Sequence, residues 1–346
     1  MTVFKRQVAV FLTLFLAGCG AGNGGNPSLP TVPATNVVAA PLSVDVSGVA
    51  VDQLTPSTSP SPDASTDSSA NRWRRSPATS TIFVGVTGEI VSSVSLYKAP
   101  FNGGAAASTI CCDLNALVLD TKGDLFTLTG SNSLQEYAPP YTGSATSTPL
   151  LGFAPVVMEG ELAVNPSGDV FVPDFQGNKV QGYASPYSSA PMKTITTSIN
   201  EPAWLRFDGA GNLFVANGGN GNVMEYASSY TGAPMKRIRN LVNFTHGANF
   251  HAFAVDASDD IFVANAVGNT VTEYVPPYTG RSSRRTIKVG VNSPNGLVVD
   301  GNGYLFVVNS GNNTVTEYNP PSYATYQTVV TLSGGGQSFS GEIAVH

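Results

Sequence analysis

From about Thr81 onward, the chain repeats short apolar segments that are separated by polar turns. The clearest mark of the repeat is an apolar triplet followed by Asp or Asn, spaced roughly 45 residues apart. The polar residue of this mark falls at Asp120, Asn165, Asp208, Asp256 and Asp300. A period of this length indicates a supersecondary unit that packs against copies of itself.

Each unit predicts four short β-strands. The apolar triplet is followed by a small turn, a second strand such as residues 213–215 (LFV), and a Gly/Asn-rich loop. A third strand ends on Tyr, as in residues 223–226 (VMEY), and a Pro/Tyr turn leads to a fourth strand. Four strands of about five residues form an antiparallel meander, and no helical period is present. Radial closure protects the edges of such sheets, so we predict an all-β fold, a β-propeller of four-stranded antiparallel blades.

The two ends of the repeat region predict how the ring closes. Residues 82–84 (IFV) match the second strand of a unit, so the first unit lacks its own first strand. The chain finishes in residues 342–346 (EIAVH), a first strand with nothing after it. Pairing the two gives six blades, closed by the C-terminal strand in the N-terminal blade. Residues 48–52 (GVAVD) are the alternative first strand, but they would need a connection of about thirty residues instead of a turn.

The repeated strand-turn-strand pattern is plainest in residues 297–309 (LVVDGNGYLFVVN). It resembles the NHL-repeat group of β-propellers. More loosely, it is similar to the gluconolactonase/regucalcin-like and virginiamycin B lyase-like propellers. The resemblance covers residues 81–346 and implies the propeller fold, but it leaves activity open because propellers host binding modules, lyases and lactonases on one architecture.

The N-terminal segment predicts export and lipid attachment. Lys5 and Arg6 precede an apolar run over residues 8–16, which has the length of a secretory signal and is too short for a permanent membrane span. Residues 16–19 (LAGC) resemble the lipobox of bacterial lipoproteins, which implies a signal peptide over 1–18 and an acylated Cys19. Gly20 stands where an Asp would favour inner-membrane retention in such proteins, so we expect outer-membrane anchoring in the cell envelope. Residues 19–80, rich in Gly, Pro, Ser and Thr, predict a disordered tether to the propeller over 81–346.

Composition and charge narrow the possible partners. Charged residues make up 12% of the chain, too few for the polar faces of helix bundles, and the net charge of -6 argues against nucleic-acid binding. We expect a monomer. The adjacent Cys111 and Cys112 fit no zinc spacing, and both a reduced pair and a vicinal disulfide remain open. Basic residues gather on two neighbouring fourth strands, where they either meet an acidic protein or polysaccharide or discourage edge aggregation: Lys236, Arg237, Arg239, Arg281, Arg284, Arg285 and Lys288.

Candidate functional residues lie where the first strands enter the channel. Polar or aromatic groups fall there at Asn115, Glu161, Trp204, His251, Asn295 and Glu342, and we favour Glu161, Trp204, His251 and Glu342 because blade architecture does not explain them. Three interpretations compete for this ring. Its oxygen atoms suit Ca²⁺ or Mg²⁺. His251 beside Glu161 or Glu342 suits general-base chemistry. Alternatively, Asn, Gly and Asp serve tight turns, which is the interpretation that we favour for Asp174, Asn217, Asn265 and Asn309 after the second strands.

The gluconolactonase-like resemblance implies a particular pair of metal ligands, Glu201 and Asn295. That family's catalytic Asp has no counterpart here, so no catalytic residue is assigned. We therefore expect a binding or scaffolding module that uses the channel-mouth face, with no assured cofactor, rather than an enzyme. A metal-assisted lactonase or lyase is the alternative, and a purely structural envelope protein is the third possibility.

Overall fold

The computed structural model describes residues 80–87, 92–99, 101, 106–111, 114, 116–129, 133–142, 144–150, 161–188, 190–239, 241, 250–278, 284–332 and 338–346. All of them belong to the unit Asp67–His346. The predicted signal peptide, Cys19, the tether, Asn115 and Cys112 therefore lie outside the described residues. Within the described part every regular element is a β-strand, and no helix there is long and apolar enough to cross a membrane.

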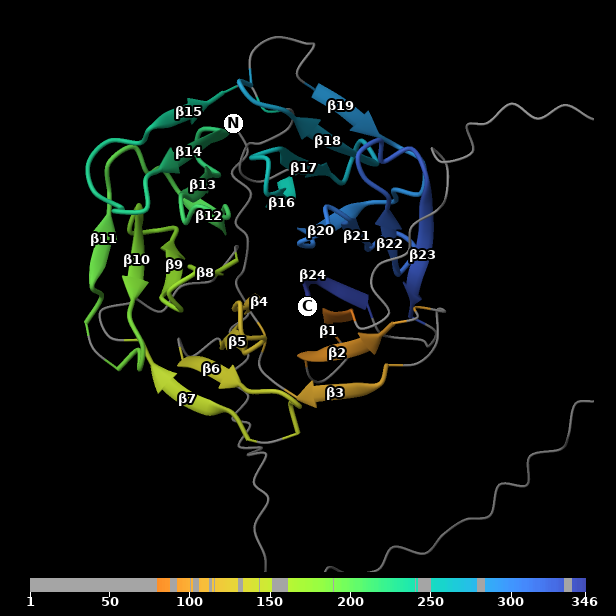
Figure 1. Ribbon diagram of the computed structural model, residues 1–346, viewed down its shortest axis with the longest axis horizontal. Coiled ribbons are helices and arrows are strands. Elements are labelled where there is room, and N and C mark those ends of the chain that lie inside the picture. The colour runs from red at the N-terminus through yellow and green to blue at the C-terminus, as the bar shows by residue number, and fades with distance from the viewer. Residues whose placement is uncertain are drawn as a thin grey trace, which may run out of the picture. The chain divides into compact units, whose positions relative to one another are not determined.

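The strands form six four-stranded antiparallel sheets arranged around a central axis (Figure 1). We number these sheets blades 1 to 6. Blade 1 contains β24 (Ser338–Val345), β1 (Thr81–Thr87), β2 (Ser92–Lys98) and β3 (Ser108–Cys111). Blade 2 contains β4 (Ala116–Leu119), β5 (Leu125–Leu128), β6 (Ser133–Tyr137) and β7 (Thr146–Pro149). Blade 3 contains β8 (Ala163–Val164), β9 (Val170–Asp174), β10 (Lys179–Tyr183) and β11 (Lys193–Ile195).

The second half of the ring follows the same order. Blade 4 contains β12 (Pro202–Phe207), β13 (Leu213–Asn217), β14 (Asn222–Tyr226) and β15 (Lys236–Ile238). Blade 5 contains β16 (Phe250–Val255), β17 (Ile261–Asn265), β18 (Thr270–Tyr274) and β19 (Arg284–Ile287). Blade 6 contains β20 (Pro294–Val299), β21 (Leu305–Asn309), β22 (Thr314–Tyr318) and β23 (Tyr326–Thr331). The predicted fold class and the blade count are both confirmed.

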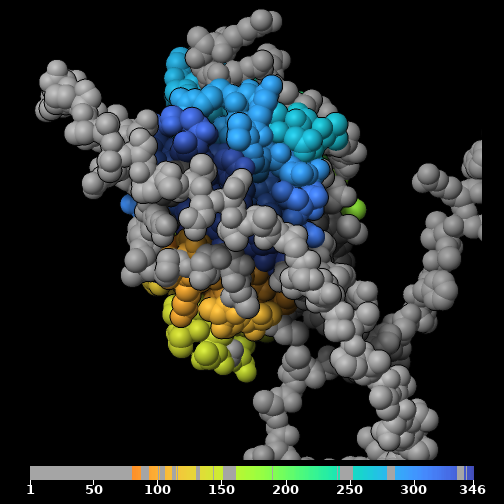
Figure 2. All heavy atoms as spheres, turned by 90° about the vertical axis from the view of Figure 1, so that its right-hand side faces the viewer, coloured from red at the N-terminus to blue at the C-terminus, as the bar shows by residue number. Residues whose placement is uncertain are grey.

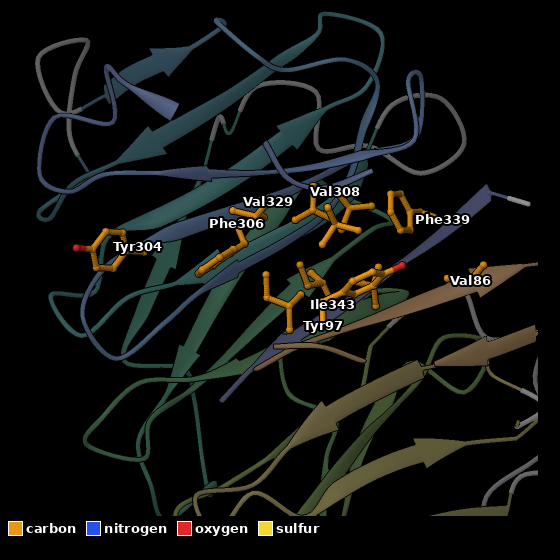
Figure 3. Packing of buried hydrophobic residues seen from close by; sticks show 12 residues of the cluster. Val86, Tyr97, Tyr304, Phe306, Val308, Val329, Phe339 and Ile343 are labelled. Carbon is orange, nitrogen blue, oxygen red and sulfur yellow. The ribbon is translucent and has the colours of Figure 1, made fainter. Parts of the chain in front are cut away.

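The C-terminal strand closes the ring, as predicted. Strand β24 pairs with β1, with Phe83 opposite Ala344, and Thr81 and His346 exchange two backbone hydrogen bonds of 2.8 and 3.0 Å. Apolar side chains of blades 6 and 1, among them Phe306 and Ile343, then form one buried cluster across the junction (Figure 3). Figure 2 shows the blue C-terminal residues lying against the orange N-terminal blade. The alternative first strand, residues 48–52, lies outside the described residues, and its proposed place is taken by β24.

Polar residues of the repeat hold the turns. Asp208 Oδ1 accepts hydrogen bonds from the N–H groups of Ala210 and Asn212 at 2.9 and 2.7 Å. Asp120, Asn165, Asp256 and Asp300 accept equivalent pairs of bonds in their own blades. After the second strands, Asn217 Oδ1 accepts a bond from the N–H of Asn200, and Asp174, Asn265 and Asn309 also bond backbone N–H groups. The interpretation of the residues after the second strands as turn-forming groups is confirmed for Asp174 and Asn265, whereas Asn217 and Asn309 hold the loop that precedes the first strand of their own blade.

A recurring tyrosine connects blades 2, 3, 4 and 6 each to the blade before it. The Tyr230 hydroxyl donates to the Gly211 carbonyl at 3.0 Å, while its ring packs edge-on against Phe171 of blade 3 at 4.7 Å. Equivalent hydroxyl bonds and ring contacts are made by Tyr141, Tyr187 and Tyr323. These aromatic residues therefore make contacts between neighbouring blades.

Two of the basic residues on the fourth strands have partners inside the fold. Lys236 Nζ lies 2.8 Å from Glu225 Oε2, and Arg285 Nε lies 3.2 Å from Glu273 Oε2. Both glutamates are buried on third strands, and an unpaired buried carboxylate is costly. These two cations therefore serve the blades, whereas Arg237, Arg239 and Lys288 are exposed.

Candidate functional site

The inner strand of every blade is an edge strand, so its unpaired side faces the channel. At the mouth these strands are irregular: the pairing register shifts between Pro202 and Trp204 in β12 and between Pro294 and Gly296 in β20. Each shift is a β-bulge, which redirects side chains and is frequent next to functional sites. The bulges fall at the predicted residues Trp204 and Asn295, near the start of the first strands of blades 4 and 6.

An ion pair joins Glu161 at the start of blade 3 to Arg206 on the first strand of blade 4. Arg206 Nη2 forms an ion pair with Glu161 Oε2. Glu161 lies just before β8 and is 5% exposed, and its N–H donates to the Ala203 carbonyl at 3.0 Å. It also forms an isolated parallel bridge with Trp204. The structure thus brings two predicted site residues, Glu161 and Trp204, together at the junction of blades 3 and 4.

Arg206 extends this contact across the channel. Its Nη2 lies 3.4 Å from the Leu297 carbonyl oxygen of β20, and its Nη1 lies 2.9 Å from the Leu205 carbonyl oxygen. Blades 3 and 6 are opposite in the six-membered ring, so one guanidinium contacts both sides of it. The side chain therefore spans the channel below the mouth.

Burial and pairing act in opposite directions on Glu161. Its burial raises the pKa of the carboxyl above its ordinary value, and the Arg206 charge and hydrogen bond oppose that rise. A guanidinium keeps its proton throughout the physiological range. The pair can therefore orient a polar ligand through charge and hydrogen bonds, but its Arg cannot take a proton in catalysis.

Sequence reasoning missed Arg206. It is the only charged residue within the apolar first-strand triplets, where LRF stands at 205–207 in place of LVV at 297–299 or LVL at 117–119. That departure from an apolar repeat was a visible signal. What the repeat could not show is that the guanidinium reaches Glu161 of the preceding blade.

A second contact brings two more predicted positions close together. Asn295 Nδ2 lies 3.5 Å from the Phe339 carbonyl oxygen, and a Cβ on Gly341 would lie 2.7 Å from the Asn295 carbonyl oxygen. Gly341 has φ of +105° and precedes Glu342, which is partly buried on β24. Asn295 Oδ1 is buried and has no hydrogen-bond partner among the described residues.

The remaining predicted site residues contribute less. Trp204 is partly buried and packs against the apolar cluster between blades 4 and 5. The backbone of His251 belongs to β16, and its side chain lies outside what the structure describes. Glu201 holds a loop of blade 4, where its carbonyl accepts the Gly218 N–H at 2.8 Å. Among the described residues, no three His, Cys, Asp or Glu side chains gather closely enough to hold a metal ion.

The six closed sheets define the class of this protein, a six-bladed β-propeller. Solved structures with a similar fold include a nidogen/laminin complex. It has 14% sequence identity and a TM-score of 0.55, and the match covers 77% of this chain and 98% of the matched chain. A streptogramin B lyase structure has 11% identity and a TM-score of 0.50, with coverage of 73% and 84%. Virginiamycin B lyase from Staphylococcus aureus has 10% identity and a TM-score of 0.49, with coverage of 73% and 85%. At such identities the likeness shows the fold alone.

No family model matches the chain, and no significant match exists among curated proteins.

Proposed function

We propose that this protein is a lipid-anchored binding module of the cell envelope that recognises a ligand at the mouth of its propeller channel. The buried pair of Glu161 and Arg206 carries the proposal. Blade architecture does not require the arginine of this pair, since the first-strand positions equivalent to Arg206 are apolar in the other five blades. Burying an ion pair seldom stabilises a fold compared with apolar residues of the same size, so a pair at the channel mouth points to a role in recognition.

Three further groups support the same face as the binding surface. Asn295 Oδ1 offers a buried acceptor, Glu342 adds a carboxylate on β24, and Trp204 adds an aromatic side chain that packs between blades 4 and 5 while its backbone pairs with Glu161. Aromatic side chains with a few polar groups are typical of sites that bind polar ligands. We propose a protein or polysaccharide ligand of the envelope, with the propeller acting as a monomer.

The binding experiment compares two faces of the propeller. The triple variant Trp204→Ala, Asn295→Ala, Glu342→Ala changes the mouth but keeps the ion pair. The matched control changes three exposed outer-edge residues, Arg237→Ala, Arg239→Ala and Lys288→Ala. Both are tested on a glycan array and against purified envelope polysaccharide.

We expect the mouth variant to lose at least tenfold in affinity while the edge variant retains binding. Retention by the mouth variant together with loss by the edge variant would assign recognition to the basic edge instead. Circular dichroism of both variants checks that the fold is intact.

Attachment to the membrane rests on residues 16–19 and on the tether that follows. In this proposal Cys19 carries the lipid, the anchor lies in the outer membrane, and the repeats belong to the NHL-like group of propellers. Cys19→Ser should move the protein from the membrane fraction to the soluble fraction, and mass spectrometry of the wild-type N-terminus should show an acylated cysteine. A wild-type chain without acyl groups would disprove this part.

A further inference from the structure

A chamber lies in the channel, on the side of Arg206 that faces away from the mouth. It has a volume of about 190 Å³ and is lined by residues of five inner strands, including Leu117, Val164, Phe207, Val298 and Ile343. Several lining residues end their strands just before the Asp turns, which places the chamber toward the face opposite the mouth. Arg206 is the only charged residue in its lining.

Arg206 separates this chamber from the mouth. Its Nη2 joins Glu161 of blade 3 to the Leu297 carbonyl of blade 6, so the guanidinium lies across the channel and contributes to the wall of the chamber. Glu161 and Asn295, the polar groups of the mouth, are absent from the lining of this cavity. The chamber is therefore a site distinct from the proposed binding face.

The guanidinium retains capacity for a further partner. Arginine has five N–H donors. Within the described part of the chain, three of them have acceptors: Glu161 Oε2, the Leu297 carbonyl and the Leu205 carbonyl. The other two, the Nε–H and one Nη1–H, make no hydrogen bond within the described part of the chain, and Arg206 lines the chamber.

Charge decides which kind of acceptor fits. Glu161 already neutralises Arg206, so a second carboxylate would bring an uncompensated negative charge into an apolar part of the channel. A neutral carbonyl oxygen accepts the same hydrogen bond without that cost. We propose that the chamber binds a small neutral molecule with an apolar body and one carbonyl acceptor that faces Arg206.

The volume sets the size of the ligand. An engineered protein cavity of roughly 150 Å³ takes up benzene. A chamber of about 190 Å³ therefore accommodates a six-membered ring with a small substituent. Apolar residues such as Val298 and Ile343 provide the surface for the ring, and the guanidinium provides the donor for the substituent.

Three probes of nearly equal size test the proposal on the full chain: acetophenone, ethylbenzene and benzoate. The reporter is the Ile343 methyl group in ¹³C-methyl NMR spectra, with Ile238 on the outer strand of blade 4 as the internal reference. We expect acetophenone to shift the Ile343 signal saturably and to bind at least about tenfold more tightly than ethylbenzene, because a hydrogen bond from a charged donor is lost. Benzoate should also bind more weakly than acetophenone.

Two variants locate the site without breaking the ion pair. Val298→Phe fills the chamber and should abolish the acetophenone shifts, whereas Val267→Phe, at a position that is 73% exposed, should leave them unchanged. Equal affinity for acetophenone and ethylbenzene would overturn the role of Arg206, and tightest binding of benzoate would identify an anion site instead. Absence of shifts with all three probes, or binding that survives Val298→Phe, would overturn the chamber itself.

Discussion

Replacing Arg206 by Met should destabilise the propeller by an amount that depends on pH. The substitution leaves Glu161, which is 5% exposed, without its cation. Removing one partner of a buried ion pair costs about 3–5 kcal/mol in other proteins. Here the carboxyl can escape the full cost by taking up a proton. Protonating a group with an ordinary pKa of 4.5 at pH 7 costs about 3.4 kcal/mol, at 1.36 kcal/mol for each pH unit.

The sign of the pH dependence follows because the Glu161 carboxyl of the variant can take up a proton in the folded state. Loss of Arg206 raises the pKa of Glu161 further in the folded state, while the unfolded value stays the same. The Glu161 carboxyl then releases its proton more readily in the unfolded chain than in the folded one. The variant therefore loses stability as the pH rises above the pKa of Glu161 in the unfolded chain. We expect a loss of about 3 kcal/mol at pH 7 and of less than about 1 kcal/mol at pH 5.

Urea unfolding at pH 5 and pH 7, followed by circular dichroism, measures this difference. The double variant Glu161→Gln, Arg206→Met should recover most of the stability at pH 7, because it removes the ionisable group. Arg237→Met is the matched control, since Arg237 is exposed and should cost less than about 0.5 kcal/mol. A loss that is equal at both pH values, or a double variant as unstable as Arg206→Met, would refute the reasoning.

Four further outcomes test the fold and the site. Tyr230→Phe removes the bond to Gly211 and should cost about 1–1.5 kcal/mol in urea unfolding, whereas Tyr326→Phe, at a position that is 39% exposed, should cost less than about 0.5 kcal/mol. Burial, followed by the charge of Asp256, raises the pKa of Asp260 to about 6. Asp260→Asn should therefore stabilise the fold at pH 7.5 by about 1 kcal/mol, a value reduced because solvent screens this partly exposed group, and hardly at all at pH 3.5. An effect of Asp260→Asn that is the same at both pH values would contradict this assignment. Removal of residues 338–346 should abolish folding because blade 1 loses its inner strand, and a soluble, cooperatively unfolding truncation would contradict the closure. Calorimetric titration with Ca²⁺, Mg²⁺ and Mn²⁺ should show no saturable heat, and binding of any of them would reopen the metal-assisted alternative.

The repeat predicted the blades because the information it carries is local. A triplet such as residues 297–299 packs between blades, and the polar residue after it closes a turn with neighbours in sequence. Each unit therefore specifies its own strands. The incomplete first unit and the extra strand at the C-terminus then specified the closure. Strand β24 begins at Ser338 rather than at the predicted Glu342, because its pairing with β1 continues past a bulge to Ser338.

Partners of charged residues were harder to predict. The sequence left the basic residues of the fourth strands as either a surface for an acidic partner or a guard against edge aggregation, whereas Lys236 and Arg285 pair with buried glutamates on the adjacent strands. The sequence shows that VMEY and VTEY recur in the third strands, but alternation alone does not say that the Glu side chain is covered. Its burial depends on what the neighbouring blade places over it.

The sequence by itself determined the propeller, its six blades and its closing strand, since these follow from apolar periodicity and turn chemistry within single units. Only the tertiary structure decided that Arg206 meets Glu161 and reaches the carbonyl of Leu297, dividing the channel into a mouth and an inner chamber. Those three groups belong to three different blades, and their distances are fixed by how the sheets pack around the axis. No pattern within one repeat records that geometry.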